Sequence, residues 1–251
     1  MSKSTGSTFG RMLLWATVLI GIPLAGLALY WLVTLPDVSD LAKHHPAETA
    51  LMEARRAQAK EQGRSQKIQY VWVPLSKISP YLQRAVVAAE DASFFAHEGF
   101  DWEGIKDAAL YNLEVGEFKR GGSTITQQLA KNLYLSSERS LLRKAREALI
   151  TRSLEQHLTK QQILELYLNV AEWGQGVFGA EAAARHHFDK PAKELTLEEA
   201  ALLAAILPSP RRYDPIRPTR YLARRQQHII RWLERGNGRR PASVTKTKNE
   251  G

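Results

Sequence analysis

An uncharged apolar run near the amino terminus limits what this chain can fold into. Residues 12–35 contain no Asp, Glu, Lys or Arg. As a helix rising about 1.5 Å per residue, the run is about 36 Å long, enough to cross a hydrocarbon layer of about 30 Å. Trp15 lies near one end and Trp31 near the other, where amphipathic rings favour the membrane interface. We expect residues 12–35 to be a transmembrane anchor and residues 1–11 a short cytoplasmic tail.

Two other interpretations of this run fit less well. A buried core helix is rarely apolar on every face over such a length. A cleaved signal peptide has a shorter apolar region and a small-residue cleavage site, which the following TLPDVSD does not offer. The Lys and Arg residues on the two flanks differ little in number, so charge alone favours an N-in, C-out topology only mildly.

The size and charge of the chain narrow its class. Its 251 residues suit one globular domain plus a targeting segment. There are 35 Lys and Arg against 26 Asp and Glu, for a formal net charge of +9. Such an excess favours a polyanionic partner: nucleic acid, an anionic lipid surface or a phosphorylated substrate. Cysteine is absent, which excludes disulfides and thiolate metal sites.

Beyond the run, the pattern is helical. Residues 36–66 are polar and Ala-rich, and we expect a helical juxtamembrane stem ending near Gly63. Residues 70–82 are apolar with two prolines, which predicts an extended piece that turns into a helix capped by Ser79 and Pro80. Apolar residues at three-to-four spacing then predict helices at 82–95, 102–115, 124–133, 141–158, 160–170, 177–187 and 196–205.

The chain ends in a basic segment and a polar tail. A last, basic helix is expected at 219–235, and residues 236–251 are expected to be disordered. Thr159 and Thr196 are predicted N-caps, and Thr196 with Glu199 fits a capping box. Because long alternating apolar–polar runs are missing, strands can only be few and short. The sequence therefore predicts one mainly α-helical domain.

The first group of candidate functional residues is EDASFFAHEG, residues 90–99. Glu90 follows the apolar stretch AVVAA, so its carboxylate is expected to be partly desolvated. Desolvation raises the pKa of a carboxyl and suits it to proton transfer. Phe94 and His97 follow at i+4 and i+7 and would share its helix face. Alternatively, this is a helix end with surface acids and Gly99 as its C′ residue.

The second group is KRGGSTITQQLAKN, residues 119–132. Gly121 and Gly122 follow two cations and make a flexible loop, after which Ser123 and Thr124 are expected to cap a helix. The N-terminus of such a helix binds phosphate through its free N–H groups and its dipole. Polar side chains along the first turns are Gln127, Gln128 and Lys131. The alternative is a plain linker. We hypothesise that the glycines let residues 115–124 move over a bound donor.

The third group is RSLLRKAREALITR, residues 139–152. On a helix, Arg143 and Lys144 lie one turn before Glu147, at i,i+4 and i,i+3 spacing. This is either ordinary surface salt bridging or a cationic face for a diphosphate in which one carboxylate holds the cations. The pattern alone does not separate the two.

Taken in order, the three groups resemble a family signature. The patterns E-D-x-x-F-x-x-H-x-G, G-G-S-T-I-T-Q-Q-x-x-K-N and R-K-x-x-E are similar to those of the family 51 glycosyltransferases of peptidoglycan synthesis. The resemblance continues through ILELYLN (163–169), EWGQGVFG (172–179), 182–188 and LPSPRRYDP (207–215), and covers about residues 67–235. It is strongest to the monofunctional members, because the chain has no room for the transpeptidase domain of bifunctional relatives. A match to S-x-x-K at 243–246 is interpreted as coincidence.

The resemblance implies a fold and an activity. The fold would be a lysozyme-like, mainly α glycosyltransferase domain, residues 67–235, on one N-terminal transmembrane helix. The enzyme would polymerise lipid II, a disaccharide-pentapeptide on undecaprenyl pyrophosphate, into β-1,4-linked glycan with inversion and without transpeptidation. Glu90 would be the general base on the 4-hydroxyl of the incoming sugar, and Glu147 the second key carboxylate.

The resemblance also assigns further residues. Substrate binding is expected from Ser123, Thr124, Gln127, Gln128, Lys131, Asn132, Arg143 and Lys144. Supporting roles are expected for Asp91, Phe94, His97, Gly121, Gly122, Asn169 and Glu172, and a structural or sugar-binding role for Tyr167. No cofactor is obligatory, although Glu147 is a candidate ligand for a divalent cation such as Mg²⁺ or Mn²⁺. The domain would lie on the outer, periplasmic side of the bacterial inner membrane, where cell-wall synthesis or division proteins are candidate partners.

Two rival functions stay open at this point. A lysozyme-like wall hydrolase or lytic transglycosylase would also use one Glu in a helical domain, but hydrolysis needs no pyrophosphate-binding cations. A membrane-anchored scaffold would explain the basic charge but not the settings of Glu90 and Glu147. Nucleic-acid binding is disfavoured, since no recognised module is present.

Overall fold

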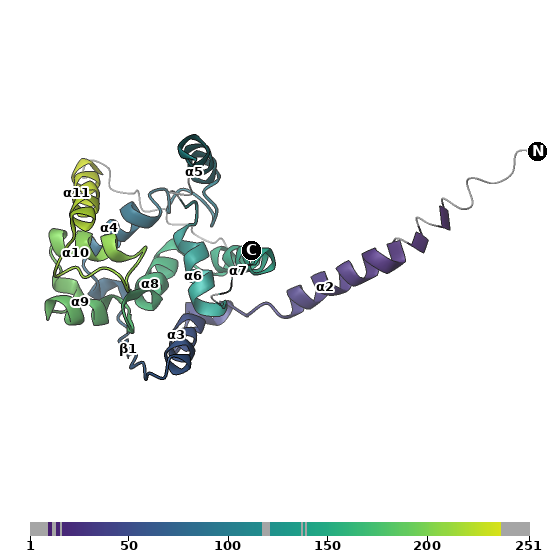
Figure 1. Cartoon of the computed structure of the whole chain (residues 1–251), viewed down its shortest axis with the longest axis horizontal. Coiled ribbons are helices and arrows are strands. Elements are labelled where there is room, and N and C mark those ends of the chain that lie inside the picture. The colour runs from purple at the N-terminus through teal and green to yellow at the C-terminus, as the bar shows by residue number, and fades with distance from the viewer. Residues whose placement is uncertain are drawn as a thin grey trace, which may run out of the picture.

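The amino-terminal run projects away from a compact helical body in the computed structural model (Figure 1). The structure describes residues 10–11, 14–15, 17–116, 121–136, 138 and 140–236. A π-helix, η1 (Thr17–Gly21), leads into α2 (Ile22–Val33). No helix within the described ranges is both long and apolar enough to cross a membrane. Most of the predicted tails 1–11 and 236–251, namely residues 1–9 and 237–251, and anchor residues 12, 13 and 16 lie outside those ranges.

The body is mainly α-helical, as expected from the sequence. Its helices are α3 (Ala50–Glu61), α4 (Pro80–Glu90), α5 (Trp102–Val115), α6 (Ile125–Tyr134), α7 (Leu141–His157), α8 (Lys160–Val170), α9 (Ala180–Phe188), α10 (Leu197–Ile206) and α11 (Arg220–Arg235). Short 3-10 helices are η2 (Ser39–Ala42), η3 (Leu75–Lys77) and η4 (Ala192–Glu194). The strands are β1 (Gln69–Tyr70), β2 (Glu172–Gly174) and β3 (Val177–Phe178), in the order β1-β3-β2, with β1 parallel and β2 antiparallel to β3.

The helix starts follow local capping chemistry. Thr159 and Thr196 cap α8 and α10, and both form capping boxes, of which the sequence predicts only the one at Thr196; the side chains of Gln162 and Glu199 accept the backbone N–H of the cap residue. Ser79 caps α4, whose first residue is a proline. The predicted N-caps Thr159, Thr196 and Ser79 are therefore confirmed.

Two predicted helices differ from the structure. The helix expected at 82–95 ends at Glu90, because Asp91 leaves the helical conformation with φ −163° and ψ 75° and turns its carboxylate towards α6. The helix expected from 177 begins only at Ala180, since Val177 and Phe178 form β3 between two positive-φ glycines, Gly176 and Gly179. A β-branched and an aromatic residue are suited to such a buried strand.

The core is built around α8, which packs against α6 and α7, while α4 packs against α10 and α11. The segment expected as a stem is helical in α3, with Gly63 at positive φ just beyond the helix. It folds onto the body: α3 contacts α6, and Val38 and Met52 are buried. Arg55 of α3 forms an ion pair with Glu172 at 2.7 Å.

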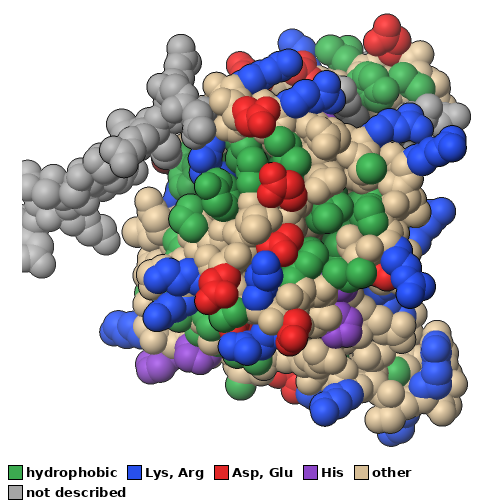
Figure 2. Space-filling model, turned by 90° about the vertical axis from the view of Figure 1, so that its left-hand side faces the viewer, with side chains coloured by type: hydrophobic (Ala, Val, Ile, Leu, Met, Phe, Trp, Pro, Cys, Tyr) green, Lys and Arg blue, Asp and Glu red, His purple; other side chains and the backbone are tan. Residues whose placement is uncertain are grey.

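The surface carries charged side chains of both signs and several exposed apolar ones (Figure 2). The face bearing α9, α10 and α11 carries scattered Lys and Arg side chains with acidic and apolar ones among them, not a single basic patch (Figure 2). Large exposed apolar side chains outside the amino-terminal run include Trp102, Leu110 and Leu113 on α5 and Leu141 and Leu142 at the start of α7.

Candidate active site

Glu90, the last residue of α4, lines a cleft. The buried side of α4, which includes Val86 and Val87, packs into the core and carries the final residue with it. The Glu90 side chain is only 11% exposed. Its Oε2 accepts a hydrogen bond from Gln128 Nε2 at 2.9 Å, and its Oε1 lies 3.4 Å from a guanidinium nitrogen of Arg225.

The surroundings of Glu90 favour its protonated form. Burial raises the pKa of its carboxyl above the ordinary value. The hydrogen bond from Gln128 and the charges of Arg225 and Lys131 oppose this rise, whereas the neighbouring Asp91 adds to it. A carboxylate with a raised pKa is a stronger base than an exposed one, so this environment suits the proton transfer predicted from the sequence.

Gln128 is fixed from behind by a buried tyrosine. The hydroxyl of Tyr167 on α8 donates to Gln128 Oε1 at 3.1 Å, which orients the amide so that its NH₂ group points to Glu90. Burial raises the pKa of Tyr167 well above its ordinary value, so this hydroxyl remains a donor. Gln128, predicted to bind substrate, therefore lies where it orients the Glu90 carboxylate.

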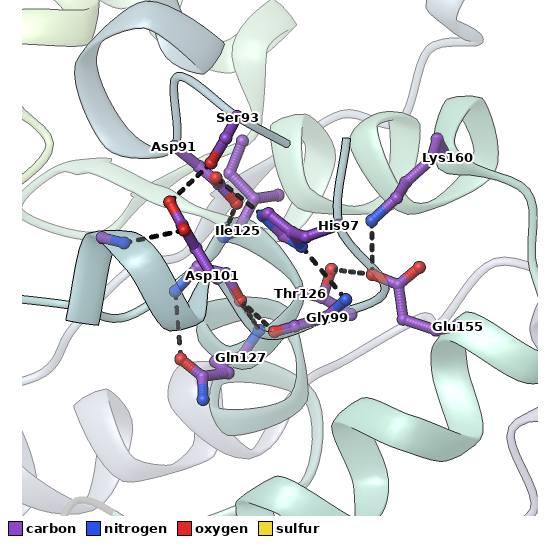
Figure 3. Close-up of polar contacts among 12 residues, drawn as sticks. Asp91, Ser93, His97, Gly99, Asp101, Ile125, Thr126, Gln127, Glu155 and Lys160 are labelled. Atoms are coloured by element: carbon purple, nitrogen blue, oxygen red, sulfur yellow. Dashed lines mark hydrogen bonds and ion pairs between the residues drawn. The ribbon is translucent and has the colours of Figure 1, made fainter. Parts of the chain in front are cut away.

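Asp91 and His97 form a second, adjoining network (Figure 3). One carboxylate oxygen of Asp91 accepts the backbone N–H of Ile125 at 3.0 Å, and the other lies 2.9 Å from His97 Nε2. The backbone N–H of Gly99 donates to His97 Nδ1 at 3.1 Å, so Nε2 carries the proton and donates to Asp91. This network joins the end of α4 to the start of α6, consistent with a supporting role.

The sequence predicts that Phe94 and His97 share a helix face with Glu90, and this prediction is wrong. The chain leaves the helix at Asp91, and the following residues form turns. Phe94 is fully buried, and the ammonium of Lys160 lies 4.5 Å from its ring centroid. Phe94 therefore packs beneath the loop that leads from Glu90 to α5.

The glycine loop lies opposite Glu90. An open cleft of about 250 Å³ is lined by Ala88, Ala89, Glu90, Asp91, Ala92, Asp101, Gly104, Gly121, Gly122, Ser123 and Thr124. Gly122 approaches α5 closely, because a Cβ there would lie 3.0 Å from the Cα of Ile105. Residues 117–120, which include the predicted loop cations Lys119 and Arg120, lie outside the described ranges.

Thr124 and Gln127 stabilise the start of α6. Thr124 is its N-cap and forms a capping box with Gln127, and the Thr124 hydroxyl donates to the carbonyl of Gly99 at 2.7 Å. The oxygen of the Gln127 amide accepts the backbone N–H of Thr124 at 3.0 Å. Ser123, just before the cap, is exposed in the cleft. Of these three predicted binding residues, Ser123 is the one whose side chain is open to a ligand.

The third group forms a compact cluster of charges on α7. Glu147 is 2% exposed, and its Oε2 accepts from Arg143 at 2.8 Å while its Oε1 is paired with Lys144. The Nε of Arg143 is buried and makes no hydrogen bond within the described part of the chain. Residue 139, at the start of this motif, lies outside the described ranges. We call Lys131, Arg143, Lys144 and Glu147 the cation cluster.

Lys131 connects this cluster with Glu90. Desolvation lowers its pKa, as do the charges of Arg143 and Lys144, while Glu147 and Glu90 both oppose that fall. Its ammonium thus interacts with both key carboxylates, although part of the side chain is exposed to solvent. The structure brings together, around one helix, the base candidate and the cations predicted for a diphosphate.

Three other predicted residues are buried in the body. Asn169 is fully buried, accepts from Val73 N at 3.0 Å and donates to the carbonyls of Val73 and Glu165. Glu172 is buried in β2 against Arg55. Asn132 is buried in the last part of α6. Asn169 and Glu172 serve contacts between segments of the body.

Sequence reasoning did not single out Arg225. A signal was present: on α11, Arg225 lies three residues after Leu222 and four before Ile229, both of which are buried. A cation on the apolar face of a helix needs a partner there, and Glu90 supplies it. Because Arg225 and Glu90 are 135 positions apart in the sequence, no local pattern predicts that they form a pair.

The described residues offer no cluster of three or more His, Cys, Asp or Glu side chains for a metal ion. Both carboxylate oxygens of Glu147 are already paired with cations. A set of cationic donors suits an anion, and Glu147 as a ligand for a divalent cation stays a prediction.

Comparison with known proteins adds a family match. A family model described as Transglycosylase matches residues 56–234. A biosynthetic peptidoglycan transglycosylase of Laribacter hongkongensis (strain HLHK9) is 49% identical over 220 residues, which cover 88% of this chain and 96% of the relative. Proteins of the same name are 47% identical in Dechloromonas aromatica (strain RCB), over 86% of this chain and 94% of theirs, and in Bordetella pertussis, over 88% and 94%.

Proposed function

Because this chain belongs to the transglycosylase family, we propose that Glu90 is the general base with which it polymerises the glycan strands of peptidoglycan. One observation carries the assignment: a carboxylate that is 11% exposed, with a raised pKa, is close enough to Lys131 to feel its charge, and Lys131 is likewise influenced by Glu147 of the cation cluster. Glycosyl transfer from a pyrophosphate needs these two parts, a base for the acceptor and cations for the leaving group.

The acceptor step uses Glu90. In this proposal the 4-hydroxyl of lipid II enters the cleft, and Glu90 removes its proton as the oxygen attacks the anomeric carbon of the growing strand. The bond from that carbon to the pyrophosphate breaks, and undecaprenyl pyrophosphate leaves with the electron pair. Direct displacement converts the α-linked donor into a β-1,4 linkage.

The leaving group is stabilised by the cation cluster. Negative charge develops on the pyrophosphate as its bond to the sugar breaks, and preorganised cations lower the energy of that transition state. Lys131, Arg143 and Lys144 supply the charge, and Glu147 keeps them together by pairing with two of them. A divalent cation, if one takes part, would be held by the pyrophosphate and not by a site built from protein carboxylates.

We further propose that residues 12–35 anchor the enzyme in the inner membrane with the domain on its periplasmic side. Arg146 lies on α7, the helix that carries Arg143, Lys144 and Glu147. Its guanidinium donates to the hydroxyl of Thr34 at 3.1 Å and also to the carbonyl of Thr34. The end of the apolar run is therefore tied to the helix of the cation cluster. Exposed apolar side chains on α5 and α7 fit the same placement, since the lipid tail of the substrate stays in the bilayer.

Removing residues 1–33 tests the anchor while leaving Thr34 in place. We expect the rate on lipid II embedded in vesicles to fall at least about tenfold, because the anchor raises the effective concentration of enzyme at the surface. The rate on a water-soluble short-chain analogue should stay within about twofold of that of the full chain. Full activity of the truncated protein on vesicles would contradict the proposal.

The activity itself is tested by incubating purified full-length protein with labelled lipid II. We expect glycan of high molecular weight that muramidase digests to disaccharide units, with one undecaprenyl pyrophosphate released per bond formed. Cleavage of preformed glycan without polymerisation would favour the hydrolase. Neither activity in a well-folded protein would favour the scaffold, for which the mixed surface of α9–α11 gives no support (Figure 2). Recruitment by division or elongation proteins stays a prediction.

A further inference from the structure

We propose that Arg225 of α11 is a positioning residue for Glu90, which holds one carboxylate oxygen and supplies the counter-charge that remains when Lys131 engages the substrate. This inference rests on the proposed role of Glu90 as base. It adds a residue from the last helix of the fold to a site otherwise built from α4, α6, α7 and the loop between α5 and α6.

The two oxygens of Glu90 have separate partners. Gln128 donates to Oε2 at 2.9 Å, and Arg225 lies 3.4 Å from Oε1. The partners come from helices far apart in the sequence, so the carboxylate is fixed from two directions. With the Tyr167 hydroxyl behind Gln128, rotation of the carboxylate would break contacts on both sides.

Helix packing places Arg225. α11 packs on both α4 and α10, with Leu222 and Ile229 buried on the same face. The Arg225 side chain is 27% exposed, and its Nε is buried without a hydrogen-bond partner among the described residues. A guanidinium that gives up hydration in this way needs a carboxylate beside it, which ties α11 to the end of α4.

The Arg225–Glu90 contact is long for an ion pair. Charge-assisted hydrogen bonds between nitrogen and oxygen usually span about 2.7–2.9 Å, against 3.4 Å here. Arg225 therefore acts on Glu90 more through its charge than through a tight bidentate bond. A lysine, which keeps the charge but lacks the planar fork, should preserve most of the effect.

The charges around Glu90 explain why a second cation is needed. Arg225 and Lys131 both favour the ionised carboxylate, Asp91 disfavours it, and the uncharged Gln128 and Tyr167 complete the surroundings. Lys131 is shared with Glu147 and, in the proposed mechanism, with the pyrophosphate. Arg225 forms an ion pair with no other carboxylate in the described structure, so its charge still favours the ionised form of Glu90 when a dianionic group draws Lys131 away.

The test compares kcat against pH for Arg225→Gln, Arg225→Lys and wild type, with lipid II as substrate. Loss of the charge should move the acidic limb of the profile to higher pH by about one unit, because an opposite charge within about 4–6 Å shifts a carboxyl pKa by one to three units. Below the limb, Arg225→Gln should be roughly tenfold slower than wild type, and above it the two rates should converge. Arg225→Lys should follow the wild-type profile.

Arg224→Gln is the matched control, because Arg224 is exposed on the same helix one residue away. Its profile should match wild type, and thermal unfolding should show that all variants are folded. A pH-independent loss in Arg225→Gln, or a raised KM with an unmoved limb, would overturn the inference in favour of a structural or substrate-binding role. Glu90→Gln measured in parallel separates the two hypotheses: if it stays active the base assignment fails, whereas if it is inactive while the limb does not move only the role of Arg225 fails.

Discussion

Glu90→Gln should lower kcat for glycan polymerisation by about 10²- to 10⁴-fold, the usual contribution of a general base. The amide has nearly the shape of the carboxylate and can keep contacts with its neighbours, but it cannot accept the proton of the attacking hydroxyl. In the wild type, the raised pKa of Glu90 should make kcat depend on pH. The rate should fall as the pH drops through that raised pKa, because the carboxyl then becomes protonated and can no longer act as a base.

Glu98→Gln is the matched control for this experiment. Glu98 is exposed in the same loop, eight positions along the chain, so its neutralisation should leave the rate within about twofold of wild type. Binding of lipid II should survive in Glu90→Gln, since the cation cluster is intact. Retention of more than a tenth of the wild-type kcat by folded Glu90→Gln would remove Glu90 from the role of base.

Glu147→Gln should have the next largest effect, a loss of about 10²- to 10³-fold in kcat, comparable to removing one group that stabilises transition-state charge. Its carboxylate is 2% exposed and pairs with both Arg143 and Lys144. Without it, Arg143 and Lys144 lose their shared counter-charge and Lys131 keeps only that of Glu90, so the three side chains should move apart and stop matching the pyrophosphate. The measurement is single-turnover transfer from lipid II, with thermal unfolding as the test of folding.

The same substitution should also change the alkaline side of the pH profile. Glu147 raises the pKa of Lys131 against desolvation and the neighbouring cations, so removing it should lower that pKa further. Lys131 would then lose its proton at a lower pH, and activity should decline earlier as the pH rises. Glu138→Gln, an exposed residue before α7, is the control. A wild-type rate and an unmoved alkaline limb in Glu147→Gln would show that the cluster does not depend on its carboxylate.

Much of the helical framework could be predicted because its signals are local. The bounds of α5 and α8 match the predicted 102–115 and 160–170, since the apolar period lies within each segment and the N-cap directly precedes it. The cluster on α7 was likewise predictable, because Arg143 and Lys144 reach Glu147 across one helical turn. Membership of the family could be predicted from the order and spacing of three motifs.

What could not be predicted depends on contacts across the fold. α4 stops at Glu90 because the Asp91 carboxylate binds the backbone of α6, 34 residues away, which outweighs the local helical pattern. Val177 pairs with Gln69 of β1, more than a hundred residues earlier, and no alternation in the sequence marks so short a strand. The Arg225–Glu90 contact is of the same kind, since only the packing of α11 on α4 creates it.

Helix α6 fixes the distance between two groups of the proposed mechanism. In the proposed mechanism Gln128 orients the base and Lys131 stabilises the leaving group, and the two residues lie three positions apart, or about 4.5 Å of rise along one helix. The spacing between the attacking and departing ends of the reaction is therefore set by covalent geometry and does not depend on closure of a loop. Every disaccharide added would meet the same separation, so strand elongation would repeat without the catalytic groups being reassembled after each cycle.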